Sequence, residues 1–183
     1  GIMTKIDREM GVWKAPANVA VNLIKFPCVN VLSNGQDLLN IDINAGKSIN
    51  VIRYFAGKGS LIWGARTLAG NDNEWRYIPI RRFFNFVEKS IRKGIEPSVF
   101  EPNDRNSLVK IKIMCENFLI KLWRDGALQG IKPEHAFYIK IGLGETMTAN
   151  DILEGKLILE IGLAPIRTVE FIIMRIELKM DTN

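Results

Sequence analysis

The chain has 183 residues, of which 47% are hydrophobic and 25% are charged, proportions typical of a folded globular protein. Its 25 lysines and arginines exceed its 20 aspartates and glutamates, and the resulting net charge of +5 suits an acidic partner without requiring nucleic acid. A single histidine, His135, excludes a two-histidine metal site, and two distant cysteines exclude a disulfide framework or zinc ribbon. We expect neither a membrane span nor a targeting segment, since no long uncharged apolar stretch occurs.

The first third of the chain predicts short elements. Residues 4–10 are expected to form one or two helical turns, and a short apolar stretch covers 19–24. Residues 49–55 partly alternate between apolar and polar, a glycine-rich turn follows at 57–59, and the alternation resumes over 61–67. This pattern predicts two strands joined by a turn.

Two amphipathic helices are the clearest features of the middle third. Pro79 is expected to open the first helix and Gly94 to end it. Its apolar residues recur at helical spacing: Ile80, Phe84, Val87 and Ile91. The second helix is predicted over 106–124, closed by a following Asp-Gly pair. Its apolar stripe comprises Leu108, Ile111, Cys115, Phe118, Leu119 and Leu122.

The last third returns to strands. We predict strands over 136–141, 156–163 and 169–178, and a short helix over 148–153 that begins with a threonine cap. The element order predicts an α+β fold, with a mixed or antiparallel sheet packed with two main helices. We expect one domain over residues 1–183, with a lead-in at 1–18, a core at 19–168 and a C-terminal strand or arm at 169–183.

Catalytic and cofactor motifs are not supported. The stretch 45–48 ends like a phosphate-binding loop, but that motif requires a glycine where the chain has Ile41. His135 has no accompanying nucleophile, and Cys115 on the apolar stripe is a core residue. The tryptophans lack a neighbouring basic stretch and are assigned to core or interface packing: Trp13, Trp63, Trp75 and Trp123. We expect no enzyme activity, no cofactor and no metal.

A basic face stands out on the first long helix, opposite its apolar stripe, with only Glu88 nearby as a counter-charge. Its residues are Arg81, Arg82, Lys89, Arg92 and Lys93. Charge of this kind on a helix is typical of an ordinary solvated face. It is also suited to docking an acidic polymer or protein surface.

The closing strand is apolar on both faces. One face carries Val169, Phe171, Ile173 and Arg175, and the other carries Glu170, Ile172, Met174 and Ile176. A strand of this kind at a chain terminus is either an interior strand of its own sheet or an arm that completes a neighbour's sheet. Composition does not choose between these two interpretations.

Several strings, in order along nearly the whole chain, carry a family resemblance. They are GVWKAPAN (11–18), SINVIRYFAGKG (48–59), IWGARTLAG (62–70), WRYIPIRR (75–82), FEPND (100–104), FLIKLWRDGALQG (118–130), GLGETMTANDILEGKL (142–157) and EFIIMRI (170–176). They resemble the C-terminal domain of contractile tail sheath proteins of phages and phage-tail-like injection particles. Departures at Leu108 and at 168–169 leave the charge and apolar pattern intact. Typical sheath proteins carry further N-terminal regions, so we expect a fragment or a short member.

The resemblance implies a structural subunit that polymerises helically around an inner tube and contracts to drive the tube through a target envelope. It implies as partners other copies of the chain, the inner tube, and baseplate and terminator proteins, with neither nucleic acid nor membrane insertion. It places the protein in a tail or tail-like particle assembled in the bacterial cytoplasm. The alternatives are a cap, baseplate or tube-binding module without the long filament, and, less favoured, a nucleic-acid binder.

Two sites acquire roles from the resemblance. The basic helix face is assigned to contact with the tube. The intersubunit strand comprises Glu170, Phe171, Ile172, Ile173, Met174, Arg175 and Ile176. A heterologous contact made by such a strand builds helical filaments rather than closed dimers.

Overall fold

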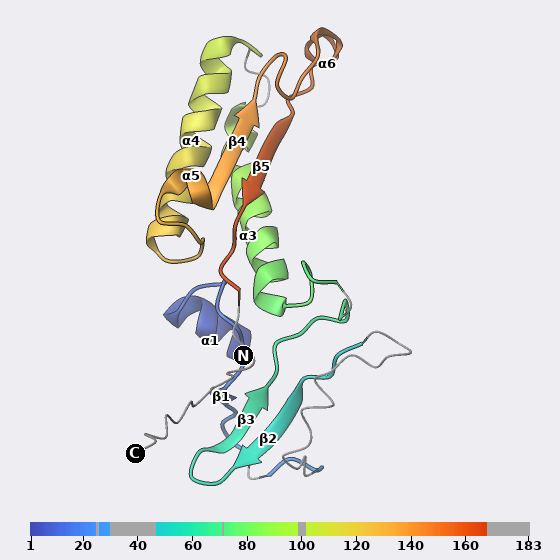
Figure 1. The fold of residues 1–183 in the computed structure, drawn as a ribbon, viewed down its shortest axis with the longest axis vertical. Coiled ribbons are helices and arrows are strands. Elements are labelled where there is room, and N and C mark those ends of the chain that lie inside the picture. The colour runs from blue at the N-terminus through green and yellow to red at the C-terminus, as the bar shows by residue number, and fades with distance from the viewer. Residues whose placement is uncertain (25, 30–46, 71, 99–101, 168–183) are drawn as a thin grey trace, which may run out of the picture.

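The computed structural model describes residues 1–24, 26–29, 47–70, 72–98 and 102–167 (Figure 1). Helices, one 3₁₀ turn and short strands alternate along the chain. They are α1 (Ile2–Glu9), β1 (Val19–Ala20), β2 (Val51–Phe55), β3 (Gly59–Trp63), α3 (Ile78–Ile95), the 3₁₀ turn η2 (Glu96–Ser98), α4 (Arg105–Arg124), α5 (Pro133–Ala136), β4 (Phe137–Ile141), α6 (Ala149–Leu153) and β5 (Leu159–Leu163). The predicted α+β class is confirmed, with two small antiparallel sheets.

The first sheet has the strand order β1-β3-β2 and is antiparallel throughout. Its hairpin closes through Gly57 and Gly59, whose φ angles of 76° and 79° suit glycine and turn the chain from β2 into β3. The strand predicted over 61–67 ends earlier, at Trp63, because Gly64 adopts a φ of 130° and breaks the extended backbone. The stretch 19–24 contributes only the two residues of β1.

The second sheet pairs β4 with β5 and carries the main core on one face. In Figure 1, α3 passes behind these two strands, α4 lies beside β4, and the two helices run in opposite directions. The buried cluster draws on both helices and the sheet and includes Phe83, Cys115 and Leu119, which are each fully buried. Phe83 was not in the predicted stripe of the first helix, whereas Phe84 from that stripe is only partly buried.

Local sequence sets the ends of α4. Asp104 precedes its first turn and accepts a hydrogen bond from the backbone N–H of Ser107 at 2.8 Å. This bond is the main reason that the pKa of Asp104 lies below its ordinary value of 3.8. The helix ends at Arg124, with Asp125 as its C-cap, and its predicted apolar stripe faces the core.

The end of α3 differs from the prediction. Gly94 does not end the helix, which continues to Ile95 and then tightens into η2. A Cβ at Gly94 would lie 3.3 Å from the side chain of Met114, so the glycine permits a close approach of α4. Its role is in helix packing, and the helix stops just before Pro97.

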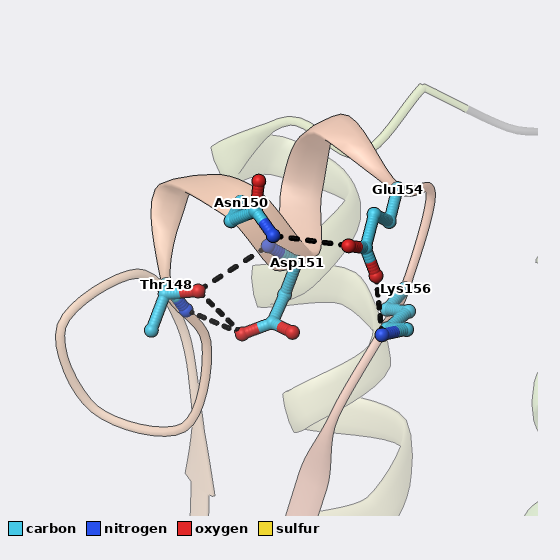
Figure 2. A network of polar contacts seen from close by, with 5 residues as sticks. All are labelled: Thr148, Asn150, Asp151, Glu154 and Lys156. Atoms are coloured by element: carbon cyan, nitrogen blue, oxygen red, sulfur yellow. Dashed lines mark hydrogen bonds and ion pairs between the residues drawn. The ribbon is translucent and has the colours of Figure 1, made fainter.

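The connection between β4 and β5 contains the short helix α6, and Figure 2 shows its polar contacts. Thr148 and Asp151 form a reciprocal capping box at the start of α6, which confirms the predicted threonine cap. The bond from the Thr148 hydroxyl, at 2.6 Å, is the main cause that lowers the pKa of Asp151. Asn150 donates to Glu154, and Glu154 pairs with Lys156. These contacts stabilise the short helix α6.

Candidate assembly interface

Three of the five predicted basic residues lie together on the exposed side of α3. Lys89, Arg92 and Lys93 are all exposed, and Arg92 pairs with Glu88 one turn earlier at 3.0 Å. That pair is largely open to solvent and contributes little to stability. The positive charge of this face is therefore available to a partner.

Arg81 shares the exposed face but is held by an aromatic contact. Its guanidinium lies 4.7 Å from the centre of the Trp75 ring. The Trp75 ring meets Phe84 edge-on, with 5.1 Å between ring centres. Trp75 thus packs as expected from the sequence, and it also fixes the direction of Arg81.

Arg82 is set apart from the other four residues. Its guanidinium donates to both carboxylate oxygens of Asp7 in α1, at 2.9 and 2.6 Å, and its side chain is only 25% exposed. This contact corrects the expectation that Glu88 is the only counter-charge near the face. Arg82 ties the N-terminal helix to α3, which leaves little of its charge for an external partner.

A groove of about 960 Å³ runs between α3 and β5. Its floor is apolar and its rim is mostly basic. The apolar residues are Trp75 before α3, Phe84, Val87, Ile91 and Ile95 from α3, and Leu157, Leu159, Ile161 and Leu163 from the β5 segment. The charged residues are Arg81, Lys89, Arg92 and Lys93, with Glu88 and Glu96. Among the described residues, β5 pairs with β4 only, so the groove lies along an open strand edge.

The sheet is narrow for the helices that cover it. Two helices packed side by side span roughly 20 Å, which matches about four strands spaced at about 4.8 Å. The layer beneath α3 and α4 has two strands among the described residues, and α3 contributes apolar side chains to the groove beyond β5. The geometry leaves room for an added strand.

The predicted closing strand over 169–178, including Glu170–Ile176, lies outside the described residues. The chain can be followed to Arg167, whose guanidinium donates to the backbone carbonyl of Asn73 at 3.1 Å. The assignment of this strand therefore stays a prediction.

The remaining candidates fit structural roles. Cys115 is fully buried, and desolvation together with the Glu116 charge raises the pKa of its thiol to about 11, which makes it an unreactive core residue. His135 is exposed on α5. Across the described ranges, no group of histidines, cysteines and carboxylates is placed to hold a metal. In the same ranges, no helix has the length and apolar character needed to cross a membrane.

A family model of the phage tail sheath C-terminal domain matches residues 70–179, more than half of the chain. The chain belongs to this tail sheath family. The resemblance found in the sequence motifs is thereby confirmed, and the family is one of structural proteins rather than enzymes. The tail sheath protein of Vibrio phage KVP40 is 22% identical over 173 residues, which are 94% of this chain and 24% of that protein.

Solved contractile particles contain chains of the same fold. A chain of the anti-feeding prophage baseplate is 43% identical with a TM-score of 0.90, and the match covers 98% of this chain and 49% of that one. A chain of the sheath complex of the PVC extracellular contractile injection system, in the contracted state, is 40% identical with a TM-score of 0.89, and the match covers 97% of this chain and 49% of that one. A chain of the contracted helical sheath of the anti-feeding prophage is 42% identical with a TM-score of 0.87, and the match covers 96% of this chain and 48% of that one. The sheath-family chain thus spans about half the length of these solved relatives.

Sequence reasoning missed two parts of this interface. The groove side of β5 was visible only as alternating apolar residues at 157, 159, 161 and 163, which also fit an ordinary core strand. The Asp7 partner of Arg82 lies 75 residues away along the chain, and no local pattern indicates it. Both features depend on how distant segments pack.

Proposed function

We propose that the chain is a building unit of a contractile sheath that surrounds an inner tube in a phage tail or a tail-like injection particle. The observation that carries this proposal is the open groove beside β5 in a chain of the tail sheath family. Similarity to chains from contracted sheaths supports a wall that polymerises helically and contracts. Assembly in the bacterial cytoplasm, with baseplate and terminator proteins at the ends, is part of the proposal.

The groove is proposed to receive the strand 170–176 of a neighbouring subunit. Such a strand would pair with the open edge of β5 and place alternate apolar side chains over α3. The apolar floor suits either face of the segment, and the basic rim suits Glu170 at its start. A chain of such head-to-tail contacts extends without closing, as a helical wall requires.

Chain geometry favours a neighbour as the source of this strand. The segment after β5 continues in the same direction, because Ala164 donates to the carbonyl of Ala136 and Ile166 donates to that of Ala127. The shortest return, a two-residue turn at 168–169, would place Met174 opposite Leu163, so that residues 170–173 of the strand 170–176 would lie beyond the end of β5. A strand from another subunit can use its whole length.

Deletion and groove substitution test the strand proposal. A chain that ends at Thr168 should stay folded and soluble but fail to form filaments in sedimentation and electron microscopy. Leu157→Glu should have the same effect, since Leu157 lines the groove and is 38% exposed. Leu153→Glu is the matched control, because Leu153 is 85% exposed and lies outside the groove lining. Normal filaments from the truncated chain would refute the proposal.

The exposed side of α3 is proposed to meet the inner tube. Lys89, Arg92 and Lys93 support this role, with Arg81 at the edge of the face, whereas the Asp7 contact removes Arg82. Each exposed ion pair contributes about 0–1 kcal/mol, so several together can bind the tube and still release it during contraction.

Charge reversal tests the tube contact. The triple variant Lys89→Glu, Arg92→Glu and Lys93→Glu should lose most co-sedimentation with the purified tube. A triple reversal on α4 at Lys110, Lys112 and Lys121 is the matched control and should bind normally. Equal tube binding by both variants would contradict the assignment, and a steep salt-dependent affinity for DNA would instead support a nucleic-acid binder.

A cap or baseplate role is the second candidate. Two of the matching structures are baseplates of the anti-feeding prophage, one of them in the contracted state. Antibody labelling of native particles separates the two roles. Label repeated along the shaft supports the sheath wall, and label confined to one end supports the cap or baseplate.

A further inference from the structure

The segment that follows β5 is held along its length before the described chain ends. The carbonyl of Ala164 accepts a hydrogen bond from the Gln129 N–H at 2.8 Å, and the Ile166 N–H donates to the Ala127 carbonyl at 3.2 Å. Leu128 and Pro165 form a bridge between these bonds. The residues that lead to the C-terminal segment are therefore fixed against the 127–129 backbone.

The last of these residues contacts a distant loop. The Arg167 guanidinium donates to the Asn73 carbonyl at 3.1 Å, although the two residues are 94 positions apart. We name residues 67–70 and 72–76 the Asn73 loop. Among the described residues, the hydrogen bond to Asn73 holds the Arg167 side chain against this loop. The Arg167–Asn73 contact involves no residue that lines the groove, although Trp75 of the same loop lines the groove and contacts Arg81.

The Asn73 loop is braced by its own side chains. The Thr67 hydroxyl donates to the Trp75 carbonyl at 2.6 Å and accepts from the Ala69 N–H at 3.1 Å. One Asp72 carboxylate oxygen accepts from two successive backbone N–H groups. Arg76 donates to the Gly70 carbonyl and to the Asn73 side chain. A loop held by this many side-chain bonds is a firm support for Arg167.

We propose that the Asn73 loop anchors the base of the C-terminal segment and that Arg167 is the positioning residue. The anchor fixes the point and direction from which residues 168–183 leave the domain. A strand with a fixed base loses less conformational freedom when it pairs with a neighbour, so the assembly equilibrium shifts toward filaments. This inference rests on the proposed exchange of the strand between subunits.

Substitution of Arg167 tests the anchor. Arg167→Ala should raise the lowest concentration at which the chain forms filaments by roughly fivefold, the effect of losing one exposed charge-assisted hydrogen bond. Arg167→Lys keeps a donor and should recover most of the loss. Lys132→Ala removes an exposed cation elsewhere and should leave the threshold unchanged. An unchanged threshold for Arg167→Ala would overturn the proposal.

A second variant separates positioning from a general loss of stability. Thr67→Val removes the hydroxyl that braces the loop and should also raise the threshold. If Arg167 acts through the loop, the double variant should raise the threshold concentration for filaments by less than the product of the two single increases. Melting temperatures of the monomeric Arg167→Ala chain should match the parent. Independent effects, or a threshold that follows the melting temperature, would overturn the proposal.

The truncated chain ending at Thr168 distinguishes this inference from the proposed function. If the truncated chain forms normal filaments, strand exchange itself is wrong. If truncation abolishes filaments while Arg167→Ala leaves the threshold unchanged, only the anchor is wrong. The proposal expects truncation to abolish filaments and Arg167→Ala to weaken them.

Discussion

Arg82 of α3 holds the Asp7 carboxylate of α1 through both oxygens, at 2.9 and 2.6 Å. The contact is partly buried, and Ile6 beside Asp7 is 3% exposed. Bidentate geometry and partial burial make this pair stronger than an ordinary surface ion pair. One helix thus performs two tasks: Arg82 fixes the N-terminal helix, while the cations on its exposed side are left for a partner.

Removing either partner of this pair should lower the free energy of unfolding. We expect Arg82→Ala and Asp7→Ala each to cost about 1–2 kcal/mol, and the double variant to cost less than their sum. Chemical denaturation of the four proteins in the cycle measures this. Tube binding by Arg82→Ala should remain normal, and additive effects of the two substitutions would contradict the contact.

The two cysteines should differ in reactivity. Cys28 is exposed, whereas burial raises the pKa of Cys115 from its ordinary value of 9.0 to about 11. A thiol reagent at pH 8 should therefore modify one cysteine in the native chain and both in denaturant. Because the folded state disfavours the Cys115 thiolate, its contribution to stability is complete below pH 9 and is lost as the pH rises toward 11. Two rapid modifications of the native chain would contradict this.

Acid should loosen the capped turns first. The pKa values of Asp104 and Asp151 lie below their ordinary value of 3.8, so their stabilising contribution is complete above that pH and is lost below it. Hydrogen exchange at α6 and at the start of α4 should increase as the pH falls below about 4. Asp151→Asn should remove that pH dependence at α6, and an unchanged dependence would count against the capping box.

Gly162 accommodates the Tyr138 ring on the outer face of the second sheet. A Cβ at this position would clash with the ring, which also donates from its hydroxyl to Glu160 at 2.9 Å. That bond is the main reason that the pKa of Tyr138 is raised above 10.0. Gly162→Ala should displace the ring and return the pKa toward its ordinary value in an ultraviolet titration. A titration identical to that of the parent would contradict the contact.

Local features of the fold could be predicted from the sequence, and distant contacts could not. The apolar spacing of α3 and α4 and the threonine cap of α6 act over a few residues, so the pattern indicates them directly. The prediction that Gly94 ends α3 was wrong, because this glycine lies inside the helix where α3 packs against the Met114 side chain of α4. Arg82 was placed correctly on its helix, but its partner comes from another segment.

The candidate interface shows the same division. Exposed cations on one side of α3 follow from helical geometry, and the structure keeps Lys89, Arg92 and Lys93 there. The groove needs α3 and β5 to lie side by side, and the Asn73 loop meets Arg167 across 94 residues. The family motifs indicated the role of the chain, and packing supplied the geometry that carries it.

The most direct test of the account is electron cryomicroscopy of filaments or native particles that contain this chain. We predict copies repeated along the shaft, with a strand from a neighbouring subunit paired along β5 in the groove over α3. A groove that is filled by the chain's own C-terminal segment, or left open in every copy of an intact wall, would contradict the central claim.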